Sequence, residues 1–205
     1  MSLHACLCCY FTDYLTGIKG VSRQTVKTYK DAFKIFIRFS SSHLSKAVTE
    51  LRVEDITPAL ILSFLDYLEQ QRKNSTRTRN ARLVALKSFA KMLRLLYPEH
   101  REISEMIFNI PQKWFGRRLI GYMDYDDILR VFASVDLRKK EGFRDYTILH
   151  LLFDSGARAS EAANLAIEFF DPNKKTLILK GKGGNYRLIE LQPKTIELVE
   201  CYIKK

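Results

Sequence analysis

The chain has 205 residues and a formal net charge of +11, from 34 Lys and Arg against 23 Asp and Glu. Abundant apolar residues with few Pro and Gly exclude a disordered chain, and the length suits one ordinary domain or two small ones. The positive charge predicts a polyanionic partner such as nucleic acid, because cations that neutralise phosphates release condensed counterions.

The first residues of the chain suggest neither export nor metal binding. Residues 1–9 are expected to be a disordered start, and they lack the pattern of a secretory signal. No apolar run is long enough to span a bilayer, so we expect no membrane partner and a cytoplasmic location. Peripheral binding to an acidic membrane is the weaker alternative. The cysteines form no CxxC pair, so we expect free thiols and no metal site.

Three helices are predicted in the first half of the chain. From Ser22 to Phe39, apolar residues recur every three or four positions, and Ser22 is a suitable N-cap. A second helix is predicted from Pro58 to about Gln71, capped by Thr57. A third is predicted over residues 75–97, where Pro98 stops it.

The second half is predicted to be a separate domain of mixed structure. The helical pattern weakens from residue 99 to about 118, so we place the linker there, with domains over residues 10–112 and 113–205. A glycine-rich GKGGN segment between two β-rich runs predicts a hairpin. The predicted elements are helices over residues 125–134, 144–153 and 157–165, strands over residues 176–180 and 186–191, and a helix from Pro193.

The third helix and the residues just before it carry positive charges and no negative ones. Between Arg72 and Arg94 there are eight Lys and Arg residues and no acidic residue. A solvated helix face usually mixes signs, because opposite charges at i,i+4 stabilise a helix and like charges repel. We therefore favour a nucleic-acid face over an ordinary solvated surface. The candidate DNA-binding residues of this helix are Ser75, Thr76, Arg77, Arg79, Arg82 and Lys87.

The first helix offers a second, weaker set of candidates at its start. Ser22 and Lys27 stand beside other polar and basic residues that could contact phosphates. An ordinary surface explains them equally well, so both interpretations stay open for this helix.

Two motifs in the second half point to a phosphate-binding site. In the segment FDSGARASEAANL, Arg158 and Glu161 follow a helix that ends at Gly156. A guanidinium can bond two phosphate oxygens, although a surface ion pair between Arg158 and Glu161 is the simpler alternative. About twenty residues later, Lys182 stands in the glycine-rich turn of the predicted hairpin. A Lys on such a turn could approach a phosphodiester and protonate a leaving oxygen, although a solvated charged turn is the favoured interpretation of the hairpin by itself.

The order and spacing of these motifs resemble the tyrosine recombinase, or phage integrase, family. The resemblance implies a mainly α fold with a small β-hairpin or sheet: a helical, SAM-like core-binding domain followed by the N-terminal part of an α+β catalytic domain. It also implies duplex DNA as partner and strand exchange through a 3′-phosphotyrosyl bond, without metal or other cofactor. Arg158 would stabilise charge on the phosphoryl oxygens, Lys182 would act as acid, and Glu161 would support the site.

The chain departs from the family pattern after the hairpin. The resemblance predicts a His followed three residues later by a second Arg, then a nucleophilic Tyr. None of the four His residues has an Arg at that spacing, and all four precede the hairpin. We therefore expect this chain to bind DNA without cutting it.

Two alternatives to a catalytically incomplete recombinase remain. One is a non-catalytic regulator or decoy derived from an integrase, and the other is a generic helical protein with a basic surface. Full-length family members self-associate on DNA, whereas a monomer is expected for this chain.

Overall fold

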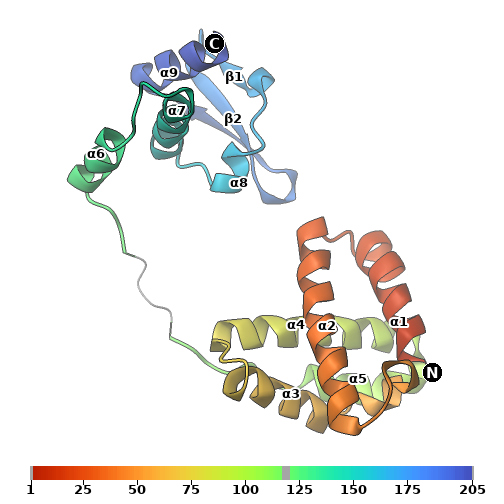
Figure 1. Cartoon of the computed structure of the whole chain (residues 1–205). Helices are drawn as coiled ribbons and strands as arrows, with labels where there is room; N and C mark the ends of the chain where they lie inside the picture. Colours follow the sequence, from red (N-terminus) through yellow and green to blue (C-terminus); the bar gives the residue numbers. More distant parts are fainter. Residues whose placement is uncertain (1, 117–120, 205) are drawn as a thin grey trace. The chain divides into compact units, whose positions relative to one another are not determined.

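The computed structural model describes residues 2–116 and 121–204, except for the side chains of Lys140 and Lys182. It is mainly helical with one three-stranded antiparallel sheet, which confirms the predicted fold class. Two compact units make up the chain, Met1–Arg118 and Leu119–Lys205 (Figure 1). The sequence predicts the boundary slightly earlier, after residue 112. No helix in the described ranges is long and apolar enough to cross a membrane.

The first unit is a bundle of helices joined by short turns. Three of its helices begin where the sequence predicts, because a hydroxyl caps each one: Ser22, Thr57 and Ser75 each accept a hydrogen bond from the backbone N–H three residues later. Its elements are α1 (Leu3–Cys9), the π-helical η1 (Tyr10–Ile18), α2 (Arg23–Leu44), η2 (Val48–Glu50), η3 (Val53–Asp55), α3 (Pro58–Gln70), α4 (Thr76–Leu96), η4 (Pro98–His100) and α5 (Arg101–Phe108).

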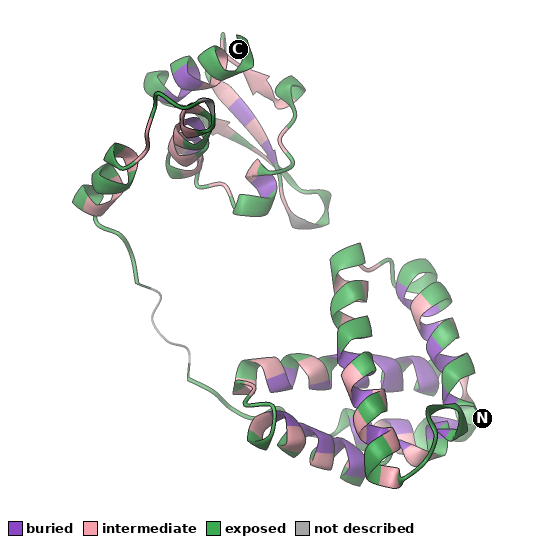
Figure 2. Ribbon diagram, viewed as in Figure 1, coloured by how far each residue is buried: buried purple, intermediate pink, exposed green. Residues whose placement is uncertain are grey.

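Helix α4 is the centre of this unit. It packs against α2, α3 and α5, so most of its circumference is buried (Figure 2). Aromatic rings from three helices meet around it, with Phe33 and Phe89 at 5.4 Å between centroids and Phe36 and Phe64 at 5.1 Å. Burying rings of this size contributes much of the stability of a small helical domain.

The expectation of a disordered start is wrong, because residues 3–9 form α1 and continue without a break into η1. The buried residues recur at helical spacing and face the common core. The N–H of Leu3 also donates to the carbonyl of Leu51 at 3.2 Å, which fixes the start of the chain. The buried stripe consists of Leu3, Cys6, Leu7, Tyr10, Tyr14 and Leu15.

The predicted linker begins too early as well, because residues 101–108 form α5. Ser104 and Ile107 are buried against α4, and the Ser104 hydroxyl donates to the carbonyl of His100 at 2.7 Å. Two buried apolar residues, Ile107 and Ile110, thus hold this segment in the core of the first unit.

The second unit combines four helices with the sheet in its described residues. The strands follow the order β1, β2, β3, all antiparallel, and α9 packs against α7. Its elements are α6 (Tyr125–Ala133), α7 (Lys140–Ser155), α8 (Ala159–Ala162), η5 (Ile167–Phe169), β1 (Phe170–Asp171), β2 (Thr176–Lys180), the turn η6 (Lys182–Gly184), β3 (Tyr186–Glu190) and α9 (Pro193–Lys204).

Two details of this unit differ from the sequence prediction. Helix α8 is only four residues long, because the N–H groups of Asn164 and Leu165 bond three residues back and tighten the chain into a turn. Strand β1 was not predicted; it is two residues long and pairs with β2 through Phe170 and Leu177.

Candidate nucleic-acid interface and active site

Glu161 is the centre of a polar cluster in the second unit. Its side chain is 4% exposed, whereas that of Arg158 is 71% exposed. Glu161 Oε1 accepts from Nη1 of Arg158 at 2.8 Å, and Oε2 accepts from the backbone N–H of Arg158 at 2.9 Å. These two hydrogen bonds, and after them the charges of Arg187 and Arg158, lower the pKa of Glu161 below its ordinary value. A buried carboxylate therefore holds an exposed guanidinium.

Arg158 lies just before α8 rather than in its first turn. As the N-cap residue, its own N–H is bonded to Glu161 and is not available to an anion. A four-residue helix also has little dipole, so an anion at this position depends on the guanidinium. The predicted ion pair and the predicted phosphate contact are compatible, since Glu161 takes only Nη1 of a largely exposed side chain.

The hairpin turn lies directly against this cluster. The N–H of Gly181 donates to the carbonyl of Asn185 at 2.7 Å and closes the turn. A Cβ added to Gly181 would lie 3.5 Å from Oε1 of Glu161. Gly183 and Gly184 both have positive φ, 78° and 80°, which only glycine adopts without strain. The structure thus brings the backbone of the predicted Lys182 to the Arg158 and Glu161 pair; the Lys182 side chain is outside the described part.

Arg187 in β3 is a member of this cluster that the sequence analysis missed. Its Nη2 donates to Oε2 of Glu161 at 2.9 Å and to the carbonyl of Gly156 at 3.1 Å. The signal was the alternation of the strands: Arg187 pairs with Leu179, and Ile189 with Leu177, so all four side chains share the inner face of the hairpin. An Arg on an inner face needs an acidic partner.

In the first unit, one strip of α4 remains open to solvent. Four basic residues lie on this strip, separated along the sequence by ten, four and three positions. Because successive residues of an α-helix are rotated by about 100°, these four side chains fall within about one quarter of the helix circumference. At the C-terminal end of α4, two of these basic groups make cation–π contacts with Phe108 of α5. Lys87 Nζ lies 5.5 Å and the Arg94 guanidinium 5.7 Å from the centroid of the Phe108 ring. Burial lowers the pKa of Lys87 below its ordinary value. We call this the basic strip; it consists of Arg77, Lys87, Lys91 and Arg94.

Arg79 does not belong to this surface, contrary to our prediction. Its side chain is 9% exposed, and Nε lies 3.5 Å from Oε2 of Glu69 in α3. Glu69 also accepts from the Thr76 hydroxyl at 3.4 Å and from Lys113 Nζ at 3.1 Å. A buried guanidinium paired with a carboxylate cannot reach a phosphate, so Arg79 joins helices instead. Asn80 adds to this role by bonding both backbone groups of Lys113, at 2.7 and 3.1 Å.

The remaining candidates of the first unit have three kinds of surroundings. Ser22 and Ser75 are exposed, but their hydroxyls already serve as helix caps. Lys27 is exposed on α2, among further basic residues of that helix. Arg82 is half-buried on the other side of α4 from the basic strip, and its pKa is lowered by burial and by Arg72. A guanidinium nevertheless stays charged at neutral pH.

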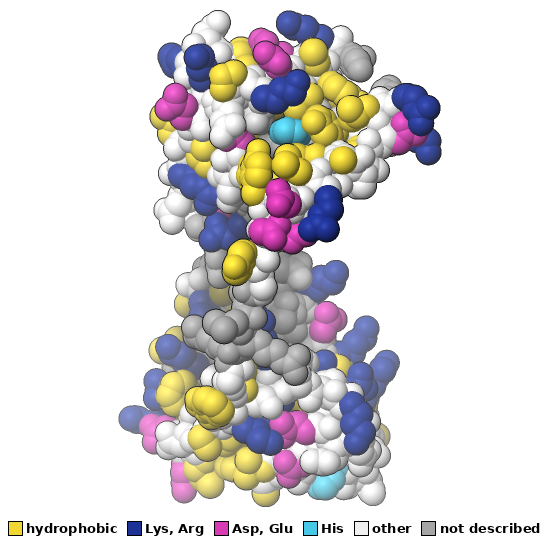
Figure 3. Space-filling model, turned by 90° about the vertical axis from the view of Figure 1, so that its left-hand side faces the viewer, with side chains coloured by type: hydrophobic (Ala, Val, Ile, Leu, Met, Phe, Trp, Pro, Cys, Tyr) yellow, Lys and Arg dark blue, Asp and Glu magenta, His cyan; other side chains and the backbone are white. Residues whose placement is uncertain are grey.

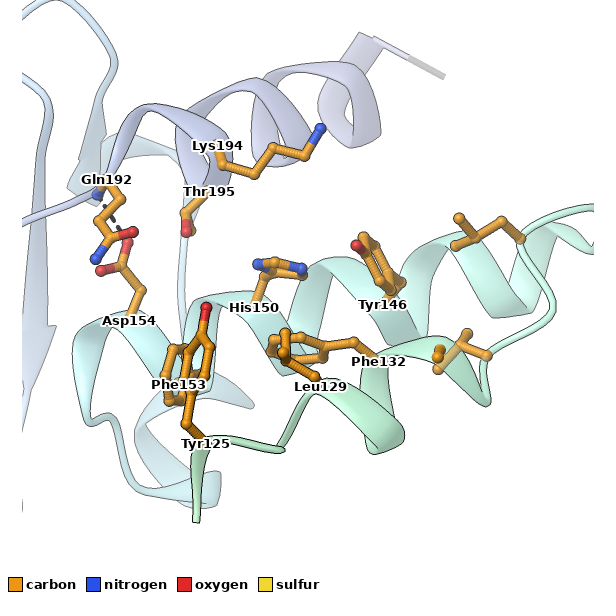
Figure 4. Close-up of a pocket in the computed structure, with 13 residues that line it drawn as sticks. Tyr125, Leu129, Phe132, Tyr146, His150, Phe153, Asp154, Gln192, Lys194 and Thr195 are labelled. Carbon is orange, nitrogen blue, oxygen red and sulfur yellow. Dashed lines mark hydrogen bonds between the residues drawn. The ribbon is translucent and has the colours of Figure 1, made fainter. Parts of the chain in front are cut away.

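The second unit also contains an apolar hollow that the sequence did not predict. A cavity of about 480 Å³ lies among α6, α7 and α9, where the rings of Phe132 and His150 stack at 4.1 Å (Figure 4). Burial, and secondarily Lys194, lowers the pKa of His150. Hydrophobic side chains gather on this face of the unit (Figure 3). No group of three or more His, Cys, Asp or Glu suited to a metal occurs among the described residues.

Comparison with known proteins matches a family model to part of the first unit and curated proteins to most of the chain. Residues 10–95, which span η1 to α4, match the family model described as phage integrase, N-terminal SAM-like domain. Tyrosine recombinase XerC of Chlamydia trachomatis is 32% identical over 94% of this chain and 64% of that protein. The protein y4rD of Sinorhizobium fredii, named as an integrase/recombinase, is 32% identical over 89% of this chain and 66% of its own length.

The chain belongs to the tyrosine recombinase, or phage integrase, family. A solved structure supports the fold: the XerH site-specific recombinase bound to palindromic difH substrate, in a post-cleavage complex, has a TM-score of 0.64. It is 23% identical and covers 87% of this chain and 52% of that chain. The chain spans 59% to 66% of the length of the curated relatives it matches first.

Proposed function

We propose that this chain binds duplex DNA as the core-binding and partial catalytic part of a tyrosine recombinase. The observation that carries the proposal is the basic strip on α4, which contains no acidic residue and lies within the segment that matches the SAM-like domain. The XerH recombinase, whose solved structure is a complex with its difH substrate, supports a nucleic-acid partner for this family. The helix α2 with Lys27 is the second proposed contact.

In the second unit, we propose that Arg158 binds a backbone phosphate. Its guanidinium is exposed, and Glu161 fixes it through one nitrogen, which leaves the rest of the fork for phosphate oxygens. Lys182 stands in the neighbouring turn and would supply the proton to a leaving oxygen. Arg158 would then stabilise negative charge on the phosphate and Lys182 would act as the acid, which are two of the functions that strand cleavage requires.

Cleavage itself is not proposed for these 205 residues. No His in the sequence stands three positions before an Arg, and the tyrosines after the hairpin turn, Tyr186 and Tyr202, belong to β3 and α9. We expect a monomer that needs no metal or small-molecule cofactor, acting on DNA in the cytoplasm. A nicked suicide duplex carrying a relative's recombination site should give a retarded, non-covalent complex; a protein–DNA band that survives denaturation would contradict this expectation.

A further inference from the structure

Arg187 joins three segments of the second unit through a single guanidinium nitrogen. Nη2 contacts the carboxylate of Glu161 in α8 and the carbonyl of Gly156, which ends α7, while the residue itself belongs to β3. Gly156 has φ of 58° and terminates α7, so its carbonyl is not used by the helix. Arg187 therefore bonds the end of one helix and the start of the next.

The carboxylate of Glu161, which Arg187 contacts, also binds Arg158. Oε2 of Glu161 is shared between Nη2 of Arg187 and the backbone N–H of Arg158, while Oε1 binds Nη1 of Arg158. With Glu161 only 4% exposed, solvent competes little for these oxygens. The direction of the exposed Arg158 side chain thus depends on a carboxylate that Arg187 helps to hold.

Arg187 also fixes the hairpin to the same point. It pairs with Leu179, which is fully buried, and lies only three residues after Gly184 in the turn. Gly181, at the other side of the turn, approaches Oε1 of Glu161. Both ends of the turn that contains Lys182 are therefore held close to Glu161, one through Gly181 and the other through Arg187.

We propose that Arg187 is a positioning residue, which through Glu161 holds the guanidinium of Arg158 and the turn of Lys182 in one fixed arrangement for a phosphate. The proposal rests on the phosphate-binding role proposed above. The Arg187 side chain is 41% exposed, and it contacts Arg158 only through the carboxylate of Glu161 that both residues share. Arg187 therefore acts on Arg158 indirectly. A residue needed only for folding would stabilise the unit without changing the behaviour of Arg158.

The test follows the side-chain Nε–Hε signal of Arg158 by NMR in the full chain. Arg187→Gln should shift this signal and raise the pKa of Glu161, because one of its positive neighbours is lost. Arg144→Gln is the matched control: Arg144 belongs to the same unit and pairs with Asp145 at 2.8 Å on the surface of α7. An Arg158 signal equally unaffected by both substitutions in a folded unit would overturn the proposal.

A double substitution tests whether the effect passes through Glu161. In a Glu161→Gln background, adding Arg187→Gln should change the Arg158 signal little further, because the shared carboxylate is already gone. Additive shifts would contradict a route through Glu161. If Arg187→Gln does not fold, Arg187→Lys carries the test, since it keeps a charge but not the fork; a wild-type Arg158 signal in it would overturn the proposal.

Inorganic phosphate supplies a functional readout without DNA. Phosphate should shift the Arg158 signal of the wild type, and Arg187→Gln should need roughly 3- to 10-fold more phosphate for the same shift, the effect of one misplaced hydrogen bond. Equal phosphate dependence in Arg187→Gln and Arg144→Gln would overturn the positioning role. The positioning role would also be overturned if the wild type binds duplex DNA but its Arg158 signal does not change when phosphate is added. That result would not contradict DNA binding by the first unit.

Discussion

Arg77 and Arg79 stand two positions apart on α4 and have opposite surroundings. Arg77 is exposed on the basic strip, while Arg79 is buried beside Glu69. Arg77→Ala should weaken binding to duplex DNA roughly 3- to 10-fold and leave folding unchanged, because it removes one phosphate contact. Arg79→Ala should instead lower the free energy of unfolding by about 1–3 kcal/mol, since Glu69 loses a buried partner.

Fluorescence anisotropy with a labelled duplex and urea unfolding separate these two effects. Arg79→Ala, measured without denaturant at a temperature where it is folded, should retain near wild-type affinity. Reversed outcomes, with Arg79→Ala losing affinity at full stability, would show that the buried guanidinium reaches the DNA after all.

The sequence could predict these residues only in part. Arg158, Glu161 and Lys182 were found because their spacing is local and resembles a family motif. Arg79 was assigned wrongly because a helix buried on most sides offers no clear polar face in its charge pattern. Arg187 was missed because its partner, Glu161, lies 26 positions earlier and only the folded hairpin brings them together.

At the scale of elements, the hairpin turn depends on two consecutive glycines. Gly183 and Gly184 both have positive φ, and a Cβ on either would meet no atom within 4 Å. Gly183→Ala and Gly184→Ala should each destabilise the turn by about 1 kcal/mol through backbone strain alone. Faster amide hydrogen exchange in β2 and β3 would report this loss.

Gly17→Ala is the control for this prediction. Gly17 lies in η1, has an ordinary φ and also meets no atom within 4 Å. Alanine there should be neutral or slightly stabilising, since it restricts the unfolded chain. Equal losses at Gly17 and at the turn would mean that the backbone conformation of the turn is not the cause.

Elements with strong caps and clear periodicity were predictable, and the short helices α1 and α5 were missed. Helices α2 and α3 begin at the predicted caps, and α4 begins one residue after its predicted start at Ser75. Helix α5 is short, but Ile103 and Ile107 stand at helical spacing and form a local signal that our prediction of a linker did not use. Helix α1 did carry a helical stripe of buried residues, which the crowded cysteines obscured.

The whole molecule consists of two units with very different cores. The first unit buries residues from every one of its α-helices, whereas five buried residues form the described core of the second and α6 has none. Apolar burial is the main source of stability. The second unit should therefore unfold at a lower temperature than the first, giving two calorimetric transitions.

Hydrogen exchange assigns these transitions to the units. Amides of α7 and β2 should exchange faster than those of α4, and a chain that ends at residue 116 should retain the upper transition. A single transition with equal protection in α4 and α7 would show that the units stabilise each other.

The salt dependence of DNA binding tests the central claim most directly. About four phosphate contacts from the basic strip should by themselves make the logarithm of the association constant fall with the logarithm of salt concentration at a slope of about −3.6, and contacts from Lys27 and Arg158 would steepen it. Affinity would then drop at least about a hundredfold between roughly 50 and 200 mM salt. Replacing Arg77 and Lys91 by Ala should make the slope shallower by about 2. A flat salt dependence, or a slope unchanged in that variant, would contradict phosphate binding by α4.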